Sequence, residues 1–220
     1  MKISGYKREN GRYGIRNYLL ILPASVCSSD TAKRIADNID GAISIPNQHG
    51  CCQIGDDYLN TVRTLVGFAK NPNVGAVLIV GLGCEGIQAG VLKEQIEESG
   101  KPVEAITIQQ EGGTIKAIAK GTEIASRLAA HVRKQQKVEF DISELVLGLE
   151  CGGSDPTSGL ASNPTIGVAS DKLVSLGGSS ILSETTEVIG AEHLIAARFE
   201  DVKAREKFLQ MVKNVEAHSA

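Results

Sequence analysis

Residues 145–159 read LVLGLECGGSDPTSG, and this stretch predicts both the fold class and the place of a functional site. Its beginning is almost continuously apolar, which is typical of a parallel strand that is buried on both faces. Glycines, a cysteine and an aspartate follow where the strand is expected to end. Cys151 offers a thiolate, which can bind a metal or act as a nucleophile, and Asp155 offers a carboxylate. We therefore expect chemistry at the carboxyl end of this strand.

A second stretch repeats the pattern. The apolar run at residues 77–80 is followed by GLGCEG at residues 81–86, which places Cys84 in a glycine-rich loop behind another buried strand. Loops at the carboxyl ends of parallel strands meet at one edge of a sheet, and ligands bind there. We therefore expect Cys84 and Cys151 to reach one site from two separate strands.

Apolar strand segments alternate with amphipathic helical segments along the whole chain, which predicts an α/β fold. We expect a mostly parallel sheet with helices on both faces, built as two similar halves. A polar break near residue 137 sets the boundary between residues 1–137 and residues 138–220. Residues 5–17 are polar and punctuated by glycine, which predicts a loop. Residues 198–215 read as one amphipathic helix.

The composition of the chain limits the classes of molecule that we expect it to bind. A net charge of -3 gives no electrostatic reason to expect nucleic acid or a membrane surface. No apolar run approaches the roughly 20 residues that cross a bilayer, and the first residues lack a signal core, so a cytoplasmic protein is expected. The 5 cysteines are an odd number, and in a reducing compartment they are more often free, metal-bound or catalytic than paired.

The loop NQHGCCQIG at residues 47–55 is the densest group of ligand atoms in the chain. His49 and Cys51 flank a glycine, a spacing that lets both side chains turn toward one metal or substrate. An isolated histidine is usually a surface or core residue, but His49 precedes two thiols in a loop behind a strand. Cys51 and Cys52 are adjacent, so at most one of them is expected to face a given site.

The GLGCEG loop also matches the dinucleotide-binding pattern GxGxxG between a strand and a helix. Cys84 and Glu85 stand where the backbone should approach a pyrophosphate, and the carboxylate would repel it. The acidic residue expected about 20 residues further on is poorly placed, because the next strand ends in Gln109 and Gln110. Binding of a nicotinamide nucleotide is therefore the weaker alternative.

Three further segments carry candidate groups. Residues 183–193, SETTEVIGAEH, follow a predicted strand at residues 179–182 and contain carboxylates and an imidazole that can hold a metal or carry a proton. Arg12 and Arg16 of the first loop can each hold a carboxylate through paired hydrogen bonds, although a solvated loop explains them equally well. Asn163 is expected to open a helix, whose amino terminus favours an anion.

Five segments in order carry a resemblance to a known family. They are GRYGIRN at 11–17, NQHGC at 47–51, GLGCEGIQ at 81–88, LECGGSDPTSGLASNPTIG at 149–167 and SETTEVIGAEH at 183–193. Together they resemble the metal-dependent sugar-acid dehydratases that include altronate and galactarate dehydratase, with sulfolactate sulfo-lyase as a relative. The resemblance implies a Rossmann-like catalytic region and dependence on Fe²⁺, with Mn²⁺ as the alternative.

The same resemblance implies a larger protein. The family's catalytic chain usually continues well beyond this length, so the second half is expected to be truncated and the activity of this chain alone is in question. A small β-rich domain, in the same chain or as a separate subunit, is the expected partner, together with self-association into a homo-oligomer.

The implied reaction is that of a hydro-lyase, a carbon–oxygen lyase. The enzyme removes the proton beside the carboxylate of a sugar acid and expels the neighbouring hydroxyl, and a divalent cation stabilises the developing enediolate. From residue type and loop position, the expected metal ligands are Cys84, Cys151, His49, Cys51 and Asp155. The expected proton carriers are Glu184, Glu187 and His193. The expected substrate-binding residues are Arg12, Arg16, Asn17, Ser154 and Asn163.

Alternatives from other classes stay open. The chain can act as a sulfo-lyase on sulfolactate, so that sulfite leaves instead of water. It can also be a non-catalytic subunit that binds an anionic metabolite or its partner domain. A thiol redox protein is the last alternative, because the sequence lacks a CxxC motif.

Overall fold

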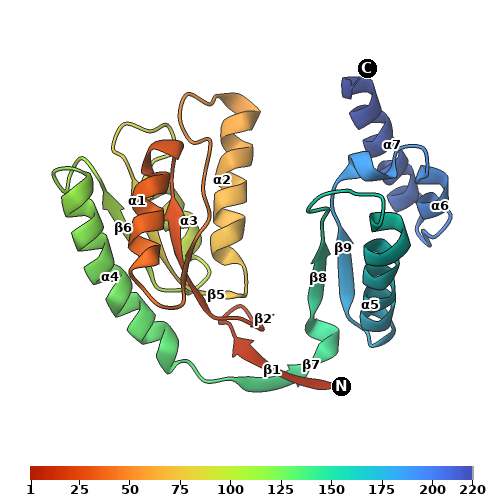
Figure 1. Cartoon of the computed structure of the whole chain (residues 1–220), viewed down its shortest axis with the longest axis horizontal. Coiled ribbons are helices and arrows are strands. Elements are labelled where there is room, and N and C mark those ends of the chain that lie inside the picture. Colours follow the sequence, from red (N-terminus) through yellow and green to blue (C-terminus); the bar gives the residue numbers. More distant parts are fainter. Residues whose placement is uncertain (220) are drawn as a thin grey trace. The chain divides into compact units, whose positions relative to one another are not determined.

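The computed structural model describes residues 1–219, and within them the chain forms two compact units (Figure 1). One unit covers Lys2–Asp141, and the other begins at Ile142 and includes Met1. Both combine helices with parallel strands, so the α/β class predicted from the sequence is confirmed. Among the described residues, no helix combines the length and the apolar character needed to cross a membrane.

The unit Lys2–Asp141 is built on a parallel sheet with the strand order β4-β3-β5-β6. The strands are β3 (Tyr18–Pro23), β4 (Ala42–Ser44), β5 (Val74–Gly81) and β6 (Val103–Thr107). β5, with the sequence VGAVLIVG, pairs with β3 and β6 and is buried along its whole length. Because all four strands run in the same direction, the loops that follow them leave from one edge, which we name the carboxyl edge.

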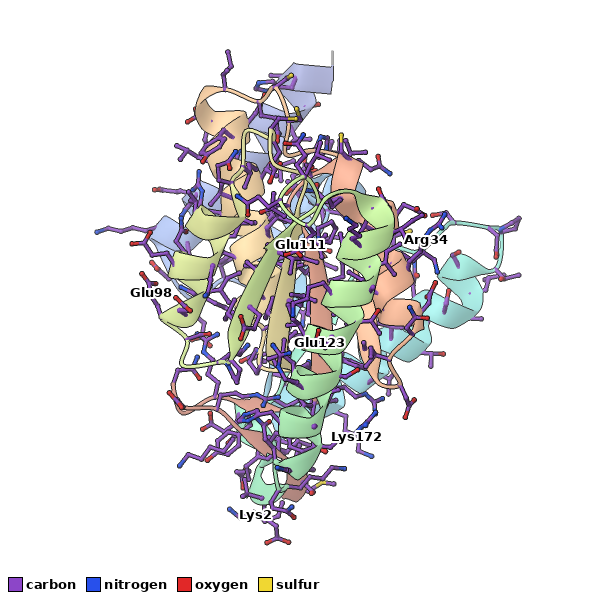
Figure 2. The ribbon with its side chains drawn as sticks, turned by 90° about the vertical axis from the view of Figure 1, so that its left-hand side faces the viewer. Lys2, Arg34, Glu98, Glu111, Glu123 and Lys172 are labelled. Atoms are coloured by element: carbon purple, nitrogen blue, oxygen red, sulfur yellow. The ribbon has the colours of Figure 1, made fainter. Side chains whose placement is uncertain are left out.

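Helices cover both faces of this sheet (Figure 1). They are α1 (Val26–Asp37), α2 (Gly55–Lys70), α3 (Ala89–Glu97) and α4 (Thr114–Lys134). Ile35 of α1 shares a buried cluster with Ile21 of β3, whereas Leu65 of α2 shares the opposite cluster with Leu20. Successive residues of β3 thus enter different cores, as expected for a parallel sheet. The outer side of α4 is charged, and Figure 2 shows Glu123, which pairs with Lys120 and Arg127, facing away from the sheet.

The structure corrects the expectation of a loop near the amino terminus. β1 (Lys2–Lys7) pairs antiparallel with β2 (Tyr13–Gly14) and with β7 (Val138–Asp141). The Tyr13 and Phe140 rings stack with their centroids 4.5 Å apart. These strands form because β7, far along the chain, supplies a partner, and such a tertiary contact overrides the local turn composition.

The unit that begins at Ile142 contains a parallel strand pair, β8 (Val146–Leu149) and β9 (Ser179–Leu182), joined through α5 (Asn163–Ser175). The expectation that β8 is buried on both faces is wrong, because Val146 is 56% exposed while Leu147 is half-buried. Ser170 of α5 bonds to the Ser180 hydroxyl of β9 over 2.8 Å, which fixes the helix against the pair. The burial of β8 therefore alternates, as in a sheet that is covered on one face.

Short helical elements complete this unit. They are the 3₁₀ turns η1 (Ile142–Glu144) and η3 (Thr185–Val188), the π-helical turn η2 (Ser158–Ser162), and the helices α6 (Glu192–Ala196) and α7 (Val202–Ser219). The single helix expected from residue 198 is wrong, because α7 begins only at Val202. The Asp201 carboxylate accepts a hydrogen bond of 2.9 Å from the Lys203 N–H. An aspartate in that position favours a helix start.

Candidate functional site

The ends of β8 and β9 bring Cys151 and Glu184 together. Leu149 and Leu182 are paired as the last residues of the two strands, and each site residue lies two positions further along. The Cys151 N–H donates a hydrogen bond to Glu184 Oε2 over 2.8 Å. The parallel register therefore places both residues at the same edge of the strand pair.

Glu187 completes a cluster with these two residues. Its N–H donates to the Glu184 carbonyl oxygen over 3.0 Å, as part of the turn η3. One ligand atom each from Cys151, Glu184 and Glu187 lies within 4.8 Å of the others, and in residues 1–219 this is the only such group of His, Cys, Asp or Glu. We name these three residues the Cys151 cluster. A thiolate with two carboxylates is a donor set that borderline divalent cations accept.

The backbone at Glu184 is strained. Its φ is +67°, and among the described residues other than glycine only Cys52 shares a positive φ. A left-handed conformation costs a residue with a side chain roughly 1–2 kcal/mol, and such conformations gather at functional sites. The strain thus marks Glu184 independently of its side-chain chemistry.

Ser154 and Asp155 border the Cys151 cluster in different ways. The Ser154 hydroxyl lies 3.5 Å from Cys151 Sγ. Asp155 Oδ1 accepts hydrogen bonds from the Thr157 hydroxyl and the Thr157 N–H, over 2.6 and 2.7 Å. The hydroxyl first, and then the N–H, hold the pKa of the Asp155 carboxyl below its usual value. Asp155 thus organises the turn that leads into η2, and its carboxylate is not one of the grouped ligand atoms.

Asn163 and His193 lie outside the cluster. Asn163 is the first residue of α5, but η2 runs directly into the helix, and the Asn163 N–H already donates to the Ser158 carbonyl oxygen. The open helix terminus expected at Asn163 is therefore continued by a preceding turn. His193 is exposed in the first turn of α6.

The remaining thiol and imidazole candidates lie at the carboxyl edge of the unit Lys2–Asp141. The loop after β4 carries His49 and Cys51, and the loop after β5 carries Cys84. Both cysteines are exposed. Cys84 and Cys151 belong to different units, and their meeting at one site stays a prediction.

Gly50 holds the first of these loops against the sheet. Its carbonyl oxygen accepts a bond of 3.1 Å from the Ile87 N–H, and the His49 carbonyl oxygen accepts one of 2.9 Å from the Val26 N–H. A Cβ on Gly50 would lie 2.2 Å from the Ala24 carbonyl oxygen, and its φ is +92°. The strand order reverses beside β3, where ligands of open sheets usually bind. Residues 49–52, which we name the HGCC loop, lie beside that position, with Gly50 against Ala24 just after β3.

Glu85 explains the glycines of the GLGCEG loop. Its buried carboxylate accepts hydrogen bonds from the N–H groups of Leu82, over 3.0 Å, and Gly83. A Cβ on Gly81 would lie 2.5 Å from Glu85 Oε1. In dinucleotide-binding loops, backbone N–H groups of this kind face the pyrophosphate. Because the carboxylate of the chain takes them here, the loop does not support the nucleotide alternative.

Arg12, Arg16 and Asn17 precede β3 and therefore lie at the edge of the sheet opposite the carboxyl edge. The Asn17 amide donates to the Val132 carbonyl oxygen over 2.9 Å and accepts from Arg8 over 2.8 Å. Asn17 thus ties the start of β3 to the end of α4. The structure does not bring these three residues together with His49, Cys51 or Cys84.

A groove of about 340 Å³ lies between the loop after β4 and α2. Its lining combines amide, hydroxyl and imidazole groups with apolar side chains. The lining residues are Ile45, Pro46, Asn47, Gln48, His49, Asn60, Thr61, Thr64, Leu65 and Phe68. Without a lysine or arginine in the lining, the groove has no strong attraction for an anion.

Comparison with known proteins adds a family match for each unit. Residues 5–133 match the family model described as D-galactarate dehydratase/Altronate hydrolase, second domain. Residues 142–220 match the model described as D-galactarate/Altronate dehydratase, C-terminal. The gap between the two matches contains the boundary at Asp141.

Curated relatives are similar over nearly the whole chain. Identity is 39% over 207 residues with (2R)-sulfolactate sulfo-lyase subunit beta of Chromohalobacter salexigens, covering 94% of this chain and 52% of that protein. It is 36% with altronate dehydratase of Escherichia coli and 31% with that of Bacillus subtilis, covering 95% and 96% of this chain and 44% of each relative. The chain thus spans about half the length of these relatives.

Proposed function

Because the chain belongs to the D-galactarate dehydratase/altronate hydrolase family, we propose that it forms the catalytic region of a lyase that removes water from a sugar acid. The observation that carries this proposal is the Cys151 cluster at the ends of β8 and β9. It lies inside the segment that matches the family's C-terminal model. Two of the relatives above are named altronate dehydratase.

The Cys151 cluster fits a divalent cation, for which we propose Fe²⁺, with Mn²⁺ as the alternative. Cys151 and Glu184 are the most firmly placed ligands, because a hydrogen bond of 2.8 Å joins the backbone of one to the carboxylate of the other. Both carboxylates of the cluster are exposed, which leaves the site accessible to a substrate. A bound cation would stabilise the negative charge that develops on substrate oxygens when the proton beside the carboxylate leaves.

Glu187 is the proposed proton acceptor. Its carboxylate belongs to the cluster, and the turn η3 holds its backbone against Glu184. A carboxylate oxygen there can take the proton from carbon and return it to the departing hydroxyl. The Ser154 hydroxyl, 3.5 Å from Cys151 Sγ, is placed to bind a substrate oxygen. His193 is the alternative proton carrier.

We also interpret the sheet of the unit Lys2–Asp141 as Rossmann-like, because helices cover both faces and the strand order reverses beside β3. We propose that the chain acts together with a further domain or subunit and self-associates. One relative is itself named as a subunit.

Elimination of sulfite from sulfolactate is the second candidate reaction. It is favoured by the 39% identity to a sulfo-lyase subunit, which exceeds the identity to either altronate dehydratase. Binding of an anionic metabolite in the groove beside His49 is less favoured, because the groove is lined by no lysine or arginine.

Metal analysis and product assays test the proposal together. The chain is purified without oxygen, alongside Cys151→Ser and the control Cys27→Ser, which changes an exposed cysteine of α1, and is assayed on altronate, galactarate and sulfolactate. We expect about one equivalent of iron in the wild type and in the control, and little in Cys151→Ser. A dehydrated sugar acid supports the hydro-lyase, and released sulfite supports the second candidate. Normal iron content and turnover in Cys151→Ser would contradict the assignment of the site.

A further inference from the structure

Cys51 and Cys52 present their thiols side by side. The two Sγ atoms are 3.8 Å apart, and both residues are exposed. Side chains of adjacent residues point to opposite faces in extended backbone. They converge here because the φ of Cys52 is +58°, in the left-handed region. The structure therefore corrects the expectation that at most one of these cysteines faces a given site.

The backbone around the thiols is held on both sides. Gly50 bonds through its carbonyl oxygen to the Ile87 N–H. Its own N–H donates to Gln53 Oε1 over 2.8 Å, and Gln53 Nε2 donates to the Thr61 hydroxyl of α2 over 2.8 Å. A strained conformation persists only where its surroundings fix it. These bonds supply that restraint, so the thiol pair is preorganised.

The spacing of the sulfurs matches one kind of ligand. Two sulfurs 3.8 Å apart, each about 2.3 Å from a shared ion, subtend an angle of about 111°, close to the tetrahedral value. A disulfide suits the pair less well, because adjacent Cα atoms are only about 3.8 Å apart, below the usual range of about 4.4–6.8 Å. Preorganised geometry of this kind favours chelation of a tetrahedral cation over oxidation.

We propose that Cys51 and Cys52 form a chelating site for one thiophilic, tetrahedral divalent cation of the Zn²⁺ class. In the described residues no further His, Cys, Asp or Glu ligand atom lies within 4.8 Å of both sulfurs. The site is therefore open, with positions left for water or an external ligand, unlike a structural zinc site that is closed by four protein ligands. The inference does not depend on the proposed lyase activity.

Cd²⁺ is a suitable probe, because cadmium–thiolate bonds absorb in the near ultraviolet. The full chain carrying Cys151→Ser, reduced and kept free of oxygen, is titrated with CdCl₂. We expect saturation at about one equivalent and competition by Zn²⁺. Cys51→Ser and Cys52→Ser added to this background should each weaken binding at least about tenfold, because one thiolate cannot chelate.

Two further variants keep the test decisive. Cys52→Gly removes the thiol but tolerates the left-handed backbone, so its loss of Cd²⁺ binding cannot be attributed to a distorted loop. Cys27→Ser removes an exposed thiol from α1 and should leave the titration unchanged. Full binding by Cys52→Gly, an equal loss in Cys27→Ser, or no binding by the reduced parent would each overturn the proposal.

Discussion

The Cys151 N–H donates a hydrogen bond of 2.8 Å to Glu184 Oε2, although Glu184 follows 33 residues later in the chain. The contact depends on the parallel register of β8 and β9, which pairs Leu149 with Leu182. Glu184 therefore has two separable roles, as an acceptor for a backbone N–H and as a negative charge in the Cys151 cluster. An amide in its place keeps the first role and removes the second.

Glu184→Gln is therefore expected to weaken Fe²⁺ or Mn²⁺ binding by about 10–100-fold, with a matching loss of turnover. The free energy of unfolding should change by less than about 0.5 kcal/mol, because the amide oxygen can still accept the Cys151 N–H. Metal content and urea unfolding measure the two effects. Glu192→Gln is the control, since Glu192 also accepts a backbone N–H, from Gly190 over 2.6 Å, but lies outside the cluster. Equal metal loss in both variants would contradict the site.

Gly50→Ala is expected to destabilise the unit Lys2–Asp141 by about 2–4 kcal/mol. The new Cβ would lie 2.2 Å from the Ala24 carbonyl oxygen, at a φ of +92°. Gly67→Ala is the control, because this glycine lies within α2 with no heavy atom within 4 Å of an added Cβ. That change should stabilise the protein by about 0.5–1 kcal/mol. Chemical denaturation compares them, and a mild effect at Gly50 would show that the HGCC loop can move away from β3.

Glu85→Ala should cost about 2–4 kcal/mol, because the N–H groups of Leu82 and Gly83 would lose their acceptor. Glu85→Gln keeps an amide oxygen in reach of both groups and should cost less. Unfolding in urea separates the two variants. If Glu85→Ala were as stable as the wild type, water would have to satisfy these groups, and the carboxylate would not be what shapes the GLGCEG loop.

Local patterns account for what the sequence predicts well. β9 lies at residues 179–182 as expected, and Cys84 and Cys151 do follow strands, because apolar runs and glycine punctuation are signals within a few residues. Such local patterns do not predict the Cys151 cluster. Sequence alone makes Glu184 and Glu187 candidates, but only the register of β8 with β9 brings them to Cys151.

Non-local contacts account for what the sequence does not predict. β1 pairs with β7 across more than a hundred residues, so the composition of the first segment could not identify a strand. The expectation that at most one of Cys51 and Cys52 faces a given site holds for ordinary backbone, which the Cys52 φ of +58° breaks. The glycines of GLGCEG are typical of a loop that binds the phosphates of a dinucleotide. In the structure, Glu85 of the same loop accepts the hydrogen bonds that such a loop would donate to a phosphate.

Lys101 provides a test of electrostatics inside the unit Lys2–Asp141. The residue is buried, and its ammonium group donates to the carbonyl oxygens of Ala69 and Asn71, at the end of α2, over 2.8 and 2.6 Å. Burial, and then repulsion by Arg8, lower the pKa of Lys101 to about 7. In the unfolded chain the pKa returns to the ordinary value of 10.5.

Between these two pKa values the unfolded state binds a proton that the folded state lacks, so the contribution of Lys101 to stability rises as the pH rises from about 7 to about 10. Lys101→Met removes this contribution, and groups shared by both proteins cancel when the two are compared. The free energy of unfolding of the wild type, minus that of the variant, should therefore rise by on the order of 2 kcal/mol across this window. The rise is smaller than the full pKa shift of Lys101 implies, because the ammonium group still reaches some solvent. Urea unfolding at pH 6, 7, 8, 9 and 10 measures the difference. A difference that stays constant with pH would mean that the two carbonyl oxygens keep Lys101 charged in the folded protein, and that they outweigh the effects of burial and of Arg8.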